Sequence, residues 1–166
     1  MKTLIIYDSF FGNTEKIAFA IAKSLTNDHS VEIHKASDFS DFINSEFDIL
    51  ILGSPTRGFK ATPLVQAFID DYSLKPGKPM AVAVFDTRIK IENIKQGFFR
   101  YIVKKGGFAA DKMMRAFSKK QIDTIVAPEG FYVIDKEGPL EAGEEQRAEN
   151  WAQTILENYT RNTNLN

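Results

Sequence analysis

The sequence predicts one α/β domain, built from a parallel β-sheet with helices on both faces. Strand and helix signals alternate along the chain, and this pattern produces βαβ units. Several apolar runs lack the polar alternation of half-exposed strands, as expected for parallel strands that are covered on both faces. With 166 residues, the chain is long enough to form one sizeable core. We therefore expect a single domain over residues 1–160 and a frayed tail over residues 161–166.

The first half of the chain is expected to supply three strands and two helices. The apolar, largely β-branched runs that predict the strands are residues 3–7, 31–34 and 47–52. Between the first two, apolar residues recur every four positions from about Asn13, as on the inner face of a helix. Pro63 stands where a first helical turn accepts proline, so a second helix is expected over residues 62–72.

The second half is expected to complete the sheet and to add an insertion. Two further strands are expected at residues 79–85 and 122–127, and a closing helix at residues 141–159. The segment from residue 88 to residue 106 is longer than a usual strand-to-helix connection. Its apolar residues are spaced for a short amphipathic helix; they are Ile94, Phe98, Tyr101 and Ile102. Glycines at 106 and 107 separate it from a second helix over residues 108–119.

The composition excludes several kinds of chemistry. The chain has no cysteine, which rules out disulfides, thiolate catalysis and iron–sulfur ligation. We find no acid–base or nucleophile constellation, and we assign no catalytic residue and no metal site. Too few consecutive apolar residues precede Asp8 for a signal peptide or a membrane span, so we expect a soluble cytoplasmic protein that does not insert into membranes.

Charge is balanced overall but uneven along the chain. The formal net charge of −1, from 21 Lys and Arg against 22 Asp and Glu, favours neither nucleic acid nor an anionic membrane as a partner. Residues 88–120, however, carry ten Lys and Arg against only Glu92 and Asp111. This stretch is either a solvated helical face or a docking surface for an acidic partner.

The segment from Asp8 to Thr14 lies directly between a buried strand and the start of a helix. Unpaired N–H groups and the helix dipole at such a junction form a site for a dianionic phosphate. Ser9, Asn13 and Thr14 add short side-chain donors, and Gly12 lets the backbone approach closely. The segment has no lysine and no G-x-G-x-x-G pattern, so neither a nucleoside triphosphatase loop nor a dinucleotide fingerprint is indicated.

The stretch S-F-F-G-N-T, residues 9–14, resembles the FMN phosphate loop of the flavodoxin family, with Phe11 where the family usually has threonine. Residues 47–68 resemble the family's third strand, flavin-contacting loop and following helix, and residues 127–152 resemble the C-terminal part of short flavodoxin-like proteins. The resemblance implies a three-layer, doubly wound, five-stranded parallel sheet of order 2-1-3-4-5. It also implies one non-covalently held FMN where the strand order reverses.

The resemblance places the FMN-binding residues in three loops. The first comprises Ser9, Phe10, Phe11, Gly12, Asn13 and Thr14; the second comprises Ser54, Pro55, Thr56, Arg57, Gly58 and Phe59; the third, after the fourth strand, comprises Phe85, Asp86, Thr87 and Arg88. Phe59 is the candidate ring for stacking on the flavin, the alternative being an exposed or core phenylalanine. Asp86 is a candidate acceptor for flavin N–H groups. Arg57 or Arg88 beside the reduced ring would raise the redox potential, unless both are solvated surface residues.

The function that the resemblance implies is electron transfer by bound FMN, with redox proteins as partners and a monomeric or weakly dimeric state. A carrier fits better than an enzyme with its own substrate, because the flavin itself supplies the chemistry. One alternative is an FMN-dependent oxidoreductase acting on a quinone- or porphyrinogen-like molecule, since the insertion would provide a pocket or lid. Another is an interaction module without cofactor, because Phe11 departs from the family pattern.

Overall fold

A computed structural model describes residues 1–26, 29–41, 47–72, 81–95 and 97–164 of the chain. The strands are β1 Lys2–Tyr7, β2 Ser30–Lys35, β3 Ile49–Pro55, β4 Ala81–Ile89 and β5 Glu129–Val133. The α-helices are α1 Asn13–Leu25, α2 Pro63–Asp71, α3 Gly97–Gly106, α4 Ala109–Lys119 and α5 Glu144–Thr163. Two short 3₁₀ segments, η1 Ala36–Asp41 and η2 Ile91–Asn93, complete the described elements.

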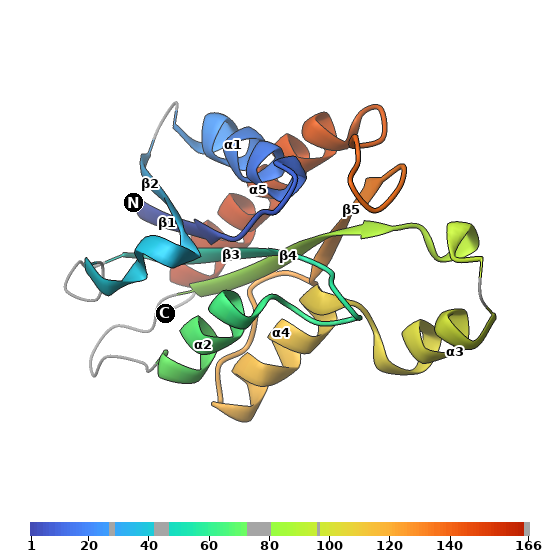
Figure 1. Cartoon of the computed structure of the whole chain (residues 1–166). Helices are drawn as coiled ribbons and strands as arrows, with labels where there is room; N and C mark the ends of the chain where they lie inside the picture. Colours follow the sequence, from blue (N-terminus) through green and yellow to red (C-terminus); the bar gives the residue numbers. More distant parts are fainter. Residues whose placement is uncertain (27–28, 42–46, 73–80, 96, 165–166) are drawn as a thin grey trace.

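The five strands form one parallel sheet in the order β2-β1-β3-β4-β5. Helices α1 and α5 cover one face of the sheet, and α2 and α4 cover the other (Figure 1). The three-layer, doubly wound fold and the strand order predicted from the sequence are therefore confirmed. Parallel strands that are joined by helices end at the same edge of the sheet, so their carboxyl ends gather the connecting loops.

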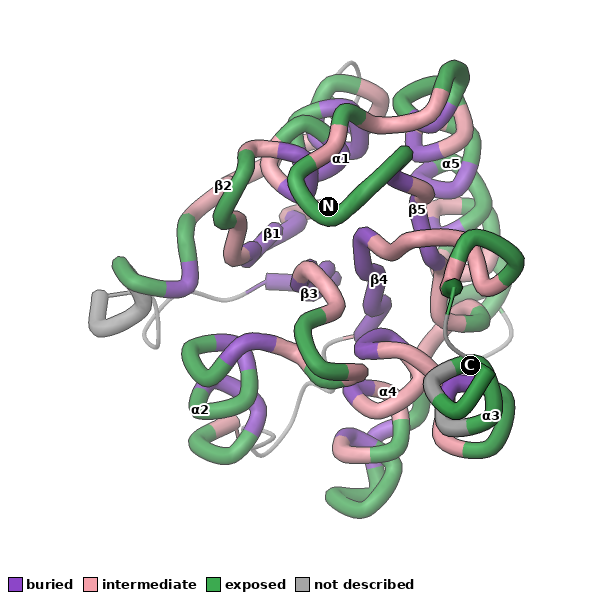
Figure 2. Tube along the Cα trace, turned by 45° about the vertical axis from the view of Figure 1, so that its right-hand side comes forward, coloured by how far each residue is buried: buried purple, intermediate pink, exposed green. Residues whose placement is uncertain are grey.

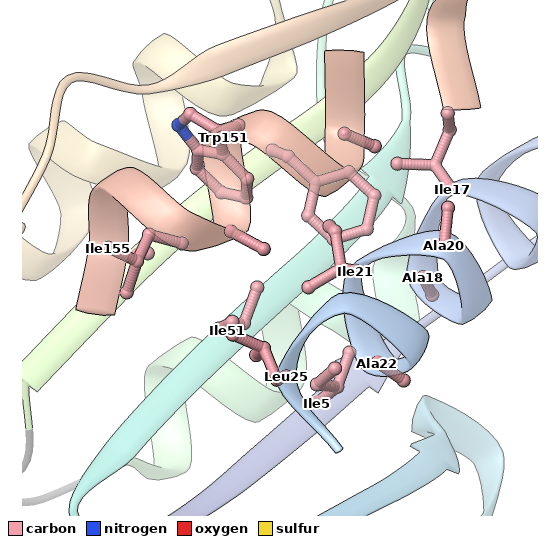
Figure 3. Close-up of a cluster of buried hydrophobic side chains, with 14 of the residues drawn as sticks. Ile5, Ile17, Ala18, Ala20, Ile21, Ala22, Leu25, Ile51, Trp151 and Ile155 are labelled. Atoms are coloured by element: carbon pink, nitrogen blue, oxygen red, sulfur yellow. The ribbon is translucent and has the colours of Figure 1, made fainter. Parts of the chain in front are cut away.

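The sheet separates two apolar cores, and Figure 2 shows its central strands β1, β3 and β4 as largely buried. One core lies under α1 and α5, where Ile21, Ile51 and Trp151 approach one another (Figure 3). The other lies under α2 and α4 and includes Leu50 and Phe117. Each large apolar side chain that is fully buried contributes about 1.5–3 kcal/mol relative to an exposed one. Burial on both faces explains why these strands lack polar alternation.

Strands β4 and β5 differ from the sequence-based prediction. β4 continues to Ile89, so residues 85–88 belong to a strand, and the prediction that they form a loop is wrong. Its extended end pairs with residues 129–133, which makes these β5 in place of residues 122–127. The earlier segment contributes a single bridge, between Thr124 and Val82. Pro128 has no N–H to donate and interrupts the ladder between the two segments.

The ends of the helices also refine the prediction. The insertion after β4 contains η2 and α3, as the helical spacing indicated. Helix α5 runs to Thr163, three residues into the expected tail, and the Thr163 hydroxyl donates to the Tyr159 and Thr160 carbonyls. Residues 165–166 of that tail, like residues 79–80 of the expected fourth strand, lie outside the described residues. Across the described residues, no helix combines the length and apolar character needed to cross a bilayer.

Gly53 lets β3 and β4 pack closely on the α1 side of the sheet. A Cβ at this position would lie 2.2 Å from Cζ of Phe85, whose ring is held between Phe131 and Trp151. Because that ring has no free space to enter, Gly53→Ala should lower the free energy of unfolding by about 1–3 kcal/mol in urea denaturation. Gly97→Ala is the matched control, since a Cβ there meets nothing within 4 Å. Equal stability of the two variants would contradict this packing.

Candidate functional site

A pocket opens at the carboxyl ends of the strands, where the chain turns from β1 into α1. The loop after β1, the ends of β3 and β4, and the segment after β5 form its walls. In sheets of this strand order, ligands lie in the crevice between the first and third strands. The lining residues are Ser9, Phe10, Phe11, Asn13, Thr14, Pro55, Thr56, Arg57, Thr87, Arg88, Ile89, Val133 and Lys136.

The loop from Ser9 to Thr14 forms the wall on the α1 side. Gly12 adopts a left-handed conformation, with φ +78°, directly before the first residue of α1. Glycine accepts this conformation without the steric cost of a side chain. The Ser9 hydroxyl accepts a hydrogen bond of 3.4 Å from the Glu15 N–H, so the loop folds back onto the first helical turn. The N–H groups that begin α1 have no acceptor within the helix and are donors for an anion.

Two side chains of this loop tie it to neighbouring segments. The hydroxyls of Thr14 and Thr87 are 2.8 Å apart, and both residues are buried. Asn13 donates through Nδ2 to the Glu137 carbonyl at 2.9 Å. Gly138, which follows, has φ +104° and leaves no room for a Cβ beside the Asn13 amide. The loop after β1, the end of β4 and the segment after β5 are thus held together around the pocket.

Arg57 and two phenylalanines form the outer part of the pocket. The Arg57 guanidinium lies 4.9 Å from the ring centroid of Phe10 and 5.8 Å from that of Phe11. Both rings are largely exposed, Phe10 at 57% and Phe11 at 45%. Within the described part of the chain, the lining includes Arg57, Arg88 and Lys136 but no carboxylate. The pocket therefore carries positive charge, which favours an anionic ligand.

Asp86 and Arg88 form a buried ion pair at the base of the site. The Asp86 carboxylate is fully buried; it accepts from Nε of Arg88 at 2.5 Å, Nη2 of Arg88 at 2.8 Å and the Ala110 N–H at 2.7 Å. Burial raises the pKa of Asp86, and the Arg88 charge with the hydrogen bonds opposes that rise. The Phe108 ring covers the guanidinium at 4.2 Å. Asp86, expected as a flavin acceptor, is thus a buried partner of Arg88 and is not among the residues that line the pocket.

The second loop contributes only its middle three residues to the pocket. Pro55, Thr56 and Arg57 line it, whereas the other three expected residues, Ser54, Gly58 and Phe59, do not. The Ser54 hydroxyl is buried and accepts from the Thr62 N–H at 3.0 Å, so it fixes the turn into α2. The carbonyl of Phe59 accepts from Nζ of Lys112. The aromatic rings that line the pocket are those of Phe10 and Phe11.

Of the expected third loop, Thr87 and Arg88 line the pocket, but Phe85 does not. Phe85 is fully buried and packs edge-on against Phe131 and Trp151, with ring centroids 5.9 and 6.0 Å away. It is a core residue. Sequence reasoning missed three lining residues, Ile89, Val133 and Lys136. The apolar run from Phe131 to Ile134 was the available signal for β5, which carries Val133.

Comparison with known proteins establishes the relationship of this chain. Residues 4–130 match the family model for the flavodoxin domain. The chain belongs to the flavodoxin domain family. Among curated protein sequences, none matches it significantly.

Solved flavodoxin structures share this architecture. Oxidised flavodoxin 1 from Bacillus cereus is 19% identical, with a TM-score of 0.66 over 95% of this chain and 98% of that one. A flavodoxin from the domain Archaea is 17% identical, with a TM-score of 0.69 over 96% of this chain and 99% of that one. The rubredoxin oxygen:oxidoreductase of Desulfovibrio gigas is 19% identical, with a TM-score of 0.70, and the match covers 96% of this chain but 36% of that one. The chain thus spans about a third of that oxidoreductase, and at these identities the likeness shows the fold.

A flavodoxin fold implies FMN, and the chemistry of this pocket suits that cofactor. N–H groups of the α1 terminus, the Ser9 hydroxyl and one hydroxyl of the hydrogen-bonded pair Thr14 and Thr87 are donors for a phosphate. The cavity, however, measures about 80 Å³, well below the roughly 300–1,000 Å³ that enclose a drug-sized ligand. The cavity has room for only part of a flavin nucleotide. The exposed rings of Phe10 and Phe11 at its edge offer an apolar surface for the remaining part. The residues present therefore fit the phosphate end of FMN in their chemistry.

Proposed function

We propose that this flavodoxin-like protein binds one FMN non-covalently and transfers electrons to redox partner proteins. The observation that carries the proposal is the donor-lined, positively charged pocket at the carboxyl ends of β1, β3 and β4. The N–H groups and hydroxyls of residues 9–14, with the Thr87 hydroxyl, would hold the phosphate. The rings of Phe10 and Phe11 would contact the flavin. When bound, FMN supplies one- and two-electron redox chemistry.

Arg57 would set the electrostatics of this site. Its guanidinium is exposed and stacked on Phe10 and Phe11, whereas the charge of Arg88 is already balanced by Asp86. Positive charge stabilises negative charge that develops nearby. We therefore assign to Arg57, rather than Arg88, the role of raising the redox potential relative to a site bordered by carboxylates.

An oxidoreductase with a small-molecule substrate is the second candidate function. The observation that favours it is the position of α3, which lies beyond the end of β4 at the edge where the pocket opens (Figure 1). Among the described residues, however, the pocket lining includes no carboxylate or histidine, the side chains that would transfer a proton to a substrate. A carrier therefore remains the better-supported function.

Titration of the FMN-free protein with FMN tests the proposal. We expect a one-to-one complex with quenched flavin fluorescence and an absorption spectrum that responds reversibly to reduction and reoxidation. A colourless protein whose titration shows no change would overturn it. Sustained turnover of a quinone by the FMN-loaded protein, without a protein partner, would instead establish the second candidate.

A further inference from the structure

We propose that the insertion after β4 forms, with α4, a docking surface for a partner protein that presents an acidic surface. This inference rests on the proposed electron-transfer function. The surface, called here the basic face, consists of seven cationic side chains from three segments: Arg57, Lys60, Arg100, Lys104, Lys105, Lys112 and Arg115.

The basic face adjoins the pocket. The chain enters the insertion from Ile89, which lines the pocket, and leaves it at Phe108, whose ring lies 4.2 Å from the pocket residue Arg88. The Ala109 N–H then donates to the hydroxyl of Thr56, another lining residue, at 3.0 Å. Helix α3 projects beyond the sheet and its covering helices on this side (Figures 1 and 2). A protein that contacts α3 would therefore lie next to the proposed flavin site.

Within the described part of the chain, the cations of the basic face form no ion pairs. Some lysines and arginines elsewhere in the chain pair with carboxylates, as Lys23 does with Glu149 at 2.9 Å. Among the described residues, no carboxylate lies within ion-pair distance of any member of the basic face. Lys112 and Arg115 donate hydrogen bonds to backbone carbonyls. A carbonyl carries no net charge, so these contacts do not neutralise the two cations. Burial, together with repulsion from Lys60 and Arg115, lowers the pKa of Lys112.

Aromatic side chains stand among these cations. On α3, Phe98 is 71% exposed and Tyr101 is 58% exposed, while Val103 is buried against the protein. Phe10 and Phe11 are exposed at the pocket itself. Aromatic residues and arginine are enriched in protein–protein interfaces, and lysines at their rim steer an oppositely charged partner. The combination fits an acidic protein surface with a small apolar centre.

A partner protein explains these features better than an anionic membrane does. A helix that lies on a membrane buries its apolar face in the lipid, whereas α3 buries Val103 within the protein. The cations also come from three segments around the pocket. Since the chain as a whole has a net charge of −1, this local excess of positive charge makes the field strongly asymmetric, which orients an acidic protein during approach.

Electron transfer from a chemically reduced acidic ferredoxin to the FMN-loaded protein tests this inference. The triple variant Arg100→Gln, Lys104→Gln and Lys105→Gln removes three charges from α3. The control variant Lys16→Gln, Lys23→Gln and Arg161→Gln removes three charges from α1 and α5. At low ionic strength, the α3 variant should lower the second-order rate constant about tenfold, and the control less than about twofold. The rate of the unmodified protein should fall as salt is added.

Equal rates for the two variants would overturn the inference. A second result would also overturn it: the α3 variant reacts with ferredoxin as fast as the unmodified protein, but it alone no longer binds phosphatidylserine vesicles. That result would indicate a membrane-binding surface. The anisotropy of labelled ferredoxin measures docking without FMN. If the protein bound no FMN, the proposed function would be disproved. The docking inference would still be tested by anisotropy, which shows whether the α3 variant, and not the control, weakens ferredoxin binding.

Discussion

Asp86→Ala should lower the free energy of unfolding by about 3–5 kcal/mol, because it leaves the Arg88 guanidinium without its buried counter-charge. The same change removes the acceptor of the Ala110 N–H at the start of α4. Arg88 has little room to move toward solvent, since Phe108 and Gly130 enclose it. Urea denaturation followed by the fluorescence of Trp151, the single tryptophan, measures the loss.

Two further variants make this prediction selective. Asp86→Asn keeps the shape of the side chain and one hydrogen-bond acceptor, so it should cost less than Asp86→Ala and remain measurable if the alanine variant does not fold. Asp123→Ala removes an exposed carboxylate and should change stability by less than about 0.5 kcal/mol. Similar losses for Asp86→Ala and Asp123→Ala would show that the buried pair does not hold the base of the site.

Ser9→Asp should weaken FMN binding roughly 100-fold, or about 2.7 kcal/mol, without destabilising the FMN-free protein. A carboxylate at this position lies in the pocket and beside the Glu15 N–H that Ser9 now contacts. It would repel the phosphate and occupy the same donors. A negative charge near the start of a helix stabilises the fold slightly, by about 0.3–1 kcal/mol. Flavin fluorescence titration and urea denaturation of the FMN-free variant measure the two effects separately.

Ser9→Ala is the control for this variant. It removes one donor without adding charge, so its effect on FMN affinity should be no more than about tenfold. If Ser9→Asp bound FMN as tightly as Ser9→Ala does, the phosphate would lie outside the loop that precedes α1.

The parts of the fold set by local patterns were predictable from the sequence. β1, α1 and β3 follow from apolar runs and helical spacing, and these elements determine where the phosphate loop lies. The end of β4 was not predictable in this way, because aspartate is depleted in strands and the resemblance placed a loop at residues 85–88. Asp86 and Arg88 are accommodated there because each neutralises the other beneath Phe108. That compensation depends on tertiary contacts with distant segments.

The same limit applies to the candidate site. Residues 9–14 were identifiable from their position between a strand and a helix, whereas the choice of ring was not. Phe59 has a positive φ of +64°, and its carbonyl accepts a hydrogen bond from Nζ of Lys112. It does not line the pocket. Lys136 was missed because the Gly- and Pro-rich passage around β5 reads as turns. The excess of Lys and Arg over residues 88–120 was visible in the sequence, but the sequence does not reveal which of these cations pair with carboxylates.

Calorimetric titration of the FMN-free protein with FMN and with riboflavin tests the central claim most directly. The two ligands share the flavin ring and ribityl chain and differ only in the phosphate. If the N–H groups of α1 and the surrounding hydroxyls hold that phosphate, FMN should bind at least roughly 100-fold more tightly than riboflavin. Equal affinities, or no binding of either ligand, would contradict the phosphate site proposed for this protein.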